Sequence, residues 1–189
     1  MGRLVLVTGG ARSGKSRYAE RLVEAEGVPV VYVATMEVLD EETGRRVAHH
    51  REVRPWNWRT VEEPVDLADV LRREPAGAAV LVECLATWCG NLFWQAGLGE
   101  DDAPERWEAL VERIVEAARQ VAECAMGREG LTVVVTNEVG WGIVPVGRST
   151  RYYRDALGLV NQVFGAAAEA VVLVAAGRAL VLGDGVAGD

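Results

Sequence analysis

Short apolar runs alternate along this chain with longer segments whose apolar residues recur at helical spacing. The runs predict strands at residues 4–7, 29–34, 78–84, 132–136, 171–175 and 180–182. The longer segments predict helices at residues 16–26, 40–53, 66–73, 104–126 and 151–170. This alternation predicts an α/β fold in which a mostly parallel sheet is flanked by helices.

Length and composition fit one folded domain. The chain has 189 residues, of which 50% are hydrophobic. That share supports a single core of ordinary size and argues against a disordered chain. We expect one domain over residues 1–183 and a flexible tail over residues 184–189.

A glycine-rich segment follows the first predicted strand at once. It fits the phosphate-binding pattern G-x-x-x-x-G-K-[ST] in full, with Gly9, Gly10, Ala11, Arg12, Ser13, Gly14, Lys15 and Ser16. Lysine and arginine together number 20, and Lys15 is the only lysine. We expect the loop N–H groups to hold phosphate oxygens, Lys15 to reach the β and γ phosphates, and Ser16 to offer its hydroxyl to Mg²⁺. A chance glycine turn is the alternative, and the predicted strand and helix on either side count against it.

Polar residues follow several other predicted strands. Because ligands bind at the carboxyl ends of parallel strands, we expect Thr35, Met36, Glu83, Asn137 and Glu138 to lie near the glycine loop. Glu83 is the candidate carboxylate for Mg²⁺ or a metal-bound water, because P-loop proteins commonly hold the metal in this way. The alternative for Glu83 is a carboxylate that faces solvent or pairs with an arginine.

His49 and His50 are the only histidines of the chain. A neutral imidazole can act as a nucleophile, a base or a metal ligand, whereas a histidine pair on a charged helix often has no role at all. Neighbouring residues on a helix point about 100° apart. At most one of the two therefore faces a given site, and a two-histidine metal site is not expected.

Two loops carry residues typical of ordered connections. In the first, residues 54–64, Pro55 and two tryptophans accompany Arg54, which could contact phosphate, and Glu62, which could contact a base or ribose. The same aromatic residues could instead only anchor the connection. In the second, residues 137–145, two glycines flank Trp141 before a proline, which is typical of a shaped loop. Such a loop could bind a ligand or form a structural turn.

Charge and cysteine content narrow the class further. The formal net charge is −8, which argues against general nucleic-acid binding but not against nucleotides. The cysteines are Cys84, Cys89 and Cys124, an odd number without metal-site spacing, so we expect a reduced, cytoplasmic protein. The first two are expected to flank the end of a strand. We expect neither a membrane span nor a secretion signal, because the required apolar runs are missing.

Several motifs occur in a fixed order along the chain. The glycine loop is followed by Ala34-Thr35, His50-Arg51-x-x-Arg54-Pro55, Trp58-Arg59-Thr60 with Glu62, Asn137-Glu138-Val139-Gly140-x-Gly142-Ile143-Val144-Pro145 and Arg154-Asp155-x-x-Gly158-x-x-Asn161-Gln162. From about residue 3 to residue 182, the chain resembles the bifunctional adenosylcobinamide kinase / adenosylcobinamide-phosphate guanylyltransferase family of cobalamin biosynthesis. Many proteins share the glycine loop alone, whereas residues 137–145 together with residues 50–55 form a far more selective pattern.

The resemblance implies two reactions. ATP or GTP would phosphorylate the aminopropanol hydroxyl of adenosylcobinamide, and GMP from GTP would then be attached to the new phosphate with release of pyrophosphate. The second reaction would pass through a covalent GMP adduct on His50, with His49 as a spectator and Lys15 acting in catalysis. Ser16 and Glu83 would hold Mg²⁺. Nucleotide contacts would come from the glycine loop and from Ala34, Thr35, Met36, Arg51, Glu52, Val53, Arg54, Glu62 and Glu83.

The resemblance also implies a RecA-like P-loop fold and a homotrimer. Two other functions stay open on the residues alone. The chain could catalyse only GMP transfer, because one phosphate loop could serve either step. It could also be a GTP-binding switch, in which His50 would have no task.

Overall fold

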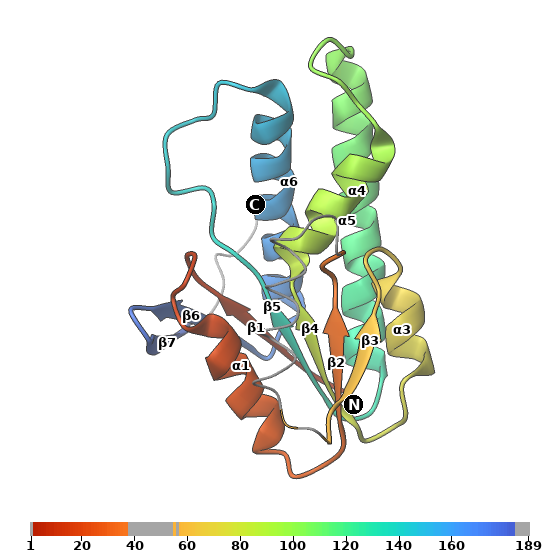
Figure 1. The fold of residues 1–189 in the computed structure, drawn as a ribbon, viewed down its shortest axis with the longest axis vertical. Coiled ribbons are helices and arrows are strands. Elements are labelled where there is room, and N and C mark those ends of the chain that lie inside the picture. Colours follow the sequence, from red (N-terminus) through yellow and green to blue (C-terminus); the bar gives the residue numbers. More distant parts are fainter. Residues whose placement is uncertain (1, 38–54, 56, 184–189) are drawn as a thin grey trace.

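The protein is built around one seven-stranded β-sheet. The computed structural model describes residues 2–37, 55 and 57–183, and its strands form one sheet in the order β3-β2-β4-β5-β1-β6-β7 (Figure 1). Strands β1 to β6 pair in parallel, and only β7 runs antiparallel to its neighbour β6. The expected mostly parallel sheet is therefore confirmed. The strands are β1 (Arg3–Thr8), β2 (Val30–Ala34), β3 (Arg59–Glu62), β4 (Ala79–Glu83), β5 (Leu131–Val135), β6 (Ala170–Ala175) and β7 (Arg178–Leu182).

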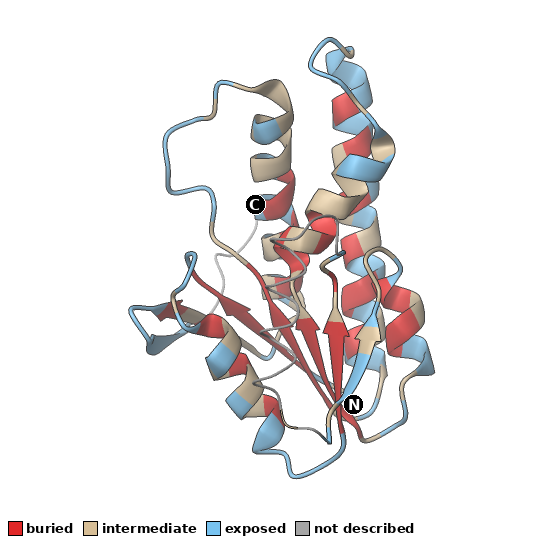
Figure 2. Ribbon diagram, in the orientation of Figure 1, coloured by how far each residue is buried: buried red, intermediate tan, exposed pale blue. Residues whose placement is uncertain are grey.

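Helices cover both faces of the sheet. The described helices are α1 (Lys15–Glu24), α3 (Leu67–Arg73), α4 (Leu85–Ala96), α5 (Pro104–Gly127) and α6 (Arg148–Ala167). Helix α1 packs on one face, and the other four pack on the opposite face, with the buried strands between them (Figures 1 and 2). The helix expected at residues 40–53 and the tail expected at residues 184–189 lie outside the described residues. None of the described helices is long and apolar enough to cross a membrane.

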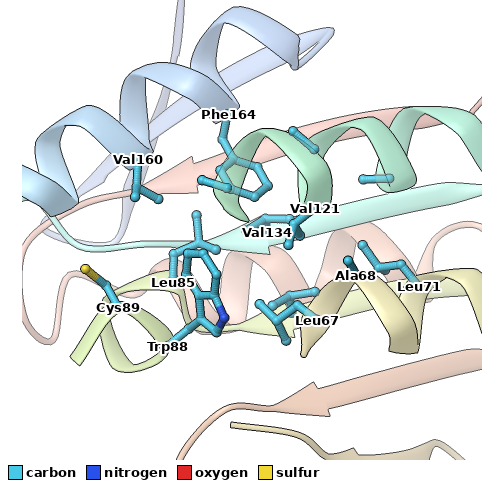
Figure 3. Close-up of a cluster of buried hydrophobic side chains, with 14 of the residues drawn as sticks. Leu67, Ala68, Leu71, Leu85, Trp88, Cys89, Val121, Val134, Val160 and Phe164 are labelled. Atoms are coloured by element: carbon cyan, nitrogen blue, oxygen red, sulfur yellow. The ribbon is translucent and has the colours of Figure 1, made fainter. Parts of the chain in front are cut away.

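Alternation along the strands divides the core into two parts. In β1, Leu4 and Leu6 face the layer of four helices, whereas Val5 and Val7 face α1. In the larger part, Trp88 of α4 is fully buried among side chains of α3, α5, α6 and the sheet (Figure 3). Its indole N–H donates a 2.7 Å hydrogen bond to the carbonyl of Val65, so the ring is both packed and satisfied.

Two elements differ from the sequence prediction. Residues 59–62, expected to belong to a loop, form β3, a short and largely exposed edge strand beside β2. The segment 85–96, for which no helix was predicted, forms α4 and ends at Gly97, whose φ of 62° suits glycine. The expectation that Cys84 and Cys89 flank a strand end is wrong for Cys89, which is buried inside α4.

Candidate nucleotide-binding site

The glycine loop joins the carboxyl end of β1 to the first turn of α1. Close contacts with the turn between β6 and β7 fix its path, because the Gly177 N–H donates to the Ser13 carbonyl at 2.8 Å. A side chain at Gly9 would place its Cβ 2.3 Å from the Val174 carbonyl oxygen, so only glycine fits there. Gly14 has a φ of 96°, a left-handed conformation that glycine adopts without strain. The backbone thus requires glycine at both positions where the pattern specifies it.

The side chain of Lys15 folds back across this loop toward Gly10. Its side chain is buried, and its ammonium donates to the Gly10 carbonyl at 3.2 Å. The Ser13 hydroxyl is buried in the same loop and has no hydrogen-bond partner among the described residues. A buried hydroxyl without a partner is costly unless a ligand completes it. A lysine and an unsatisfied hydroxyl within the loop fit a polyphosphate.

The Ser16 hydroxyl donates to Oε1 of Glu83 at the end of β4. The Tyr32 hydroxyl lies 3.5 Å from the other carboxylate oxygen. A hydroxyl and one carboxylate are oxygen ligands of the kind that Mg²⁺ accepts, together with phosphate oxygens and water. Within the described residues, no group of three or more His, Cys, Asp or Glu side chains could hold a metal by itself. The residues therefore fit a magnesium ion that arrives with a nucleotide.

Thr35 joins the ends of β2 and β4. Its hydroxyl accepts from the Cys84 N–H at 2.7 Å and donates to the Cys84 carbonyl at 3.0 Å, and its own N–H donates to the Glu83 carbonyl at 3.0 Å. Asn91 of α4 donates to the Thr35 carbonyl at 2.7 Å. Burial raises the pKa of the Cys84 thiol, which keeps it neutral beside Glu83. This network sets the position of Glu83. The Thr35 side chain is fully buried, and its hydroxyl is already used in these hydrogen bonds.

A second polar cluster lies at the carboxyl end of β5. Oε1 of Glu138 accepts from the Thr8 hydroxyl at 3.1 Å and lies 3.4 Å from the Asn161 amide nitrogen. Asn161 of α6 also accepts from the buried Thr136 hydroxyl at 2.7 Å and donates to the Asn137 carbonyl at 3.1 Å. The sequence singled out Glu138 by its place after a strand and within the motif at residues 137–145, and Asn161 only within a motif. A polar residue on the apolar face of α6 was the signal that could have identified Asn161.

The structure brings several of the predicted site residues together at one edge of the sheet. Ala34, Glu62 and Glu83 end three neighbouring strands and lie opposite one another in register. Met36 follows shortly after β2 and is half-buried, and Glu62 is exposed. The predicted nucleotide contacts Arg51, Glu52, Val53 and Arg54 and the predicted nucleophile His50 lie outside the described residues.

The loop between β5 and α6 extends beyond the sheet (Figure 1). It exposes several large apolar side chains, namely Val139, Trp141, Ile143, Val144 and Val146. At its far end the Glu100 carboxylate accepts from the Ser149 hydroxyl and from the N–H groups of Arg148 and Ser149. These hydrogen bonds, with that of the Ser149 hydroxyl first, lower the pKa of Glu100. The start of α6 is therefore tied to the connection between α4 and α5.

A phosphate loop after the first strand of a parallel sheet, with a carboxylate on a nearby strand aimed at its serine, defines this chain as a P-loop nucleotide-binding protein. Comparison with known sequences identifies the family within that class. The sequence model of the cobinamide kinase / cobinamide phosphate guanyltransferase family matches residues 5–182, and the chain belongs to this family. The resemblance noted from its motifs is thereby confirmed, as are the P-loop fold and the nucleotide and cobinamide substrates that the family name denotes.

Curated relatives agree over almost the whole chain. The bifunctional adenosylcobalamin biosynthesis protein CobU of Salmonella typhimurium is 45% identical over 177 residues, which cover 92% of this chain and 96% of that protein. The protein of the same name from Escherichia coli is 44% identical over 92% of this chain and 96% of its own length. The bifunctional adenosylcobalamin biosynthesis protein CobP of Pseudomonas aeruginosa is 42% identical over 94% and 95%, respectively.

Proposed function

We propose that this chain catalyses two successive reactions at the glycine loop. In the first, the γ-phosphoryl group of ATP or GTP is transferred to the aminopropanol hydroxyl of adenosylcobinamide. In the second, GMP from GTP is transferred to adenosylcobinamide phosphate, giving adenosylcobinamide-GDP and pyrophosphate. The observation that carries the proposal is membership of the family over residues 5–182, a span that includes the loop, Glu83 and His50.

The proposed GMP transfer uses His50 as the nucleophile. Its neutral imidazole nitrogen attacks the α-phosphorus of GTP, the bond from that phosphorus to the bridging oxygen breaks, and pyrophosphate leaves with the electron pair. An oxygen of adenosylcobinamide phosphate then attacks the same phosphorus, and the bond to the imidazole breaks. His50 lies outside the described residues, so its role rests on the sequence pattern.

The loop residues bind and neutralise the polyphosphate in both reactions. Lys15 already lies against Gly10, where its ammonium can meet phosphate oxygens. The first N–H groups of α1, which have no partner within the helix, would donate to the same phosphates. Ser16 and Glu83 would hold Mg²⁺, which offsets the negative charge of the phosphates when it is bound. We further propose nucleotide contacts from Ala34, Met36, Glu62 and residues 51–54, a cytoplasmic location, and assembly into a homotrimer. Light scattering after gel filtration tests the last point.

Labelled GTP tests the covalent step. The protein is incubated with Mg²⁺ and with GTP labelled at either the α or the γ phosphorus, without corrinoid, and is then separated on a denaturing gel. We expect α-label, but not γ-label, to remain on the protein and to be released by acid but not by alkali, as for a phosphoramidate. His50→Ala should remove the label, and the matched variant His49→Ala should retain it. If neither label is retained by the wild-type protein, the covalent mechanism is refuted.

Two further assays on the same protein distinguish the alternative functions. Adding adenosylcobinamide and γ-labelled ATP or GTP reports the kinase step, and adding adenosylcobinamide phosphate and α-labelled GTP reports GMP transfer. A protein that performs only GMP transfer gives the second product without the first. A nucleotide-binding switch gives neither product, and its slow hydrolysis of GTP does not change in His50→Ala.

A further inference from the structure

Glu138 holds a defined place beside the glycine loop. It follows β5, which pairs with β1, and its backbone N–H lies 3.3 Å from the Gly9 carbonyl that it donates to. Lys15 donates to the carbonyl of the next residue, Gly10. The backbone of Glu138 and the ammonium of Lys15 are therefore hydrogen-bonded to consecutive residues of the loop. Because the lysine of this motif reaches the β and γ phosphates, Glu138 stands beside the part of the site where the γ-phosphate is expected.

This carboxylate differs in its contacts from Glu83. Glu83 is in contact with the hydroxyl of Ser16, at the end of the loop where the metal is expected. Glu138 instead accepts from Thr8, the residue before the loop, and only through Oε1. Among the described residues, no hydrogen bond or ion pair involves its Oε2. One oxygen is thus fixed by Thr8 and Asn161, and the other stays available on a half-buried side chain.

The two reactions differ in their need for a base. An alcohol that attacks phosphorus must lose its proton, and a positioned carboxylate can accept it. In GMP transfer, the imidazole attacks through a lone pair and the phosphate of the second substrate attacks through an unprotonated oxygen. Neither nucleophile has to give up a proton to a protein base. A base beside the γ-phosphate is therefore needed for phosphoryl transfer to the hydroxyl and not for GMP transfer.

We propose that Glu138 is the general base of the phosphoryl-transfer step, an inference that rests on the proposed kinase activity. The substrate hydroxyl oxygen attacks the γ-phosphorus, and its proton passes to Oε2 of Glu138. The bond between the γ-phosphorus and the β–γ bridging oxygen breaks, and the nucleoside diphosphate leaves with the electron pair. Protonated Glu138 then returns the proton to water. Thr8 and Asn161 are positioning residues that hold Oε1.

The test compares both activities in one variant. Glu138→Gln keeps the size of the side chain and an oxygen for Thr8, but it cannot accept the proton. We expect its turnover of γ-labelled nucleotide onto adenosylcobinamide to fall by about 100-fold or more. Its transfer of GMP from α-labelled GTP to adenosylcobinamide phosphate should change by less than about threefold, and so should its Kd for GTP.

Three outcomes would overturn the proposal. An equal loss of both activities would assign Glu138 a structural role, and an unchanged kinase turnover would assign it none. In both of these cases the wild-type protein still has kinase activity, so the proposed function is not refuted. A wild-type protein that phosphorylates no adenosylcobinamide refutes both proposals at once. Glu138→Asp, which keeps an acid at shorter reach, should retain more kinase turnover than Glu138→Gln, and it provides the comparison if the glutamine variant fails to fold.

Discussion

Asn161 joins α6 to the end of β5, and its removal should destabilise the protein measurably. In Asn161→Ala, the Thr136 hydroxyl, which is 0% exposed, loses its acceptor at 2.7 Å. A buried polar group left unsatisfied costs about 1–3 kcal/mol. The Asn137 carbonyl loses a donor at 3.1 Å, which adds about 0.5–1.5 kcal/mol for a partly exposed group. The better helix propensity of alanine returns about 0.5 kcal/mol.

We therefore expect the free energy of unfolding to fall by about 2 kcal/mol. In a chain of this length, that corresponds to a Tm lowered by about 4–8 °C. Urea unfolding followed by circular dichroism measures the first quantity, and calorimetry measures the second. The kinase turnover should also fall, because Asn161 helps to hold Oε1 of Glu138.

The neighbouring residue provides the matched control. Gln162 lies on the exposed side of the same helix. Gln162→Ala should change the free energy of unfolding by less than about 0.5 kcal/mol. If Asn161→Ala is as stable as Gln162→Ala, the hydrogen bonds to Thr136 and Asn137 contribute nothing net, and the account of how α6 positions β5 is wrong.

Two further predictions concern the glycine loop and the core. Gly9→Ala should destabilise the protein by about 1–3 kcal/mol and weaken GTP binding, because the new Cβ meets the Val174 carbonyl. Gly10→Ala should have neither effect, because a Cβ at Gly10 has nothing within 4 Å. Calorimetric titration with GTP and Mg²⁺ compares the two variants, and equal affinities would contradict the steric argument. Burial raises the pKa of Cys89 from 9.0 to about 12. The unfolded chain then loses this proton first as the pH rises, so stability falls above pH 9. Between pH 8 and pH 10, the wild type should lose about 1.4 kcal/mol more than Cys89→Ala in urea unfolding, and parallel losses would show that the thiol of Cys89 ionises normally in the folded state.

The sequence predicted those elements whose pattern is set by local rules. The strands that form the centre of the sheet are uninterrupted apolar runs, and the long helix at residues 104–127 begins with a proline and repeats its apolar residues every three or four positions. The glycine loop was predicted because its backbone geometry restricts the residue types at fixed spacing. These features needed no knowledge of distant contacts.

The missed elements depend on contacts that are remote in the chain. Strand β3 has only four residues and a mostly exposed surface, so its pairing with β2 is the main reason that it is extended. Helix α4 contains no charged residue, and its apolar residues lie on its exposed side, as Trp94 does, as well as on its buried side. Its sequence therefore lacks the amphipathic pattern that marks a surface helix. The cluster of Thr8, Glu138 and Asn161 joins residues that are 130 and 23 positions apart, so no spacing in the sequence predicts it.

The positions of Glu83 and Glu138 give a physical reason why one loop could serve two reactions. Strand β5 lies between β4 and β1, so Glu83 approaches the loop at Ser16 and Glu138 approaches it at Thr8 and Gly9. Both proposed reactions require that the charge on the polyphosphate be neutralised, and the residues at the Ser16 end of the glycine loop would do this. Only transfer to an alcohol also requires that a proton be removed, and Glu138 at the Gly9 end of the loop would accept that proton. If this division is correct, substitutions at Glu83 should impair both reactions, whereas substitutions at Glu138 should separate them.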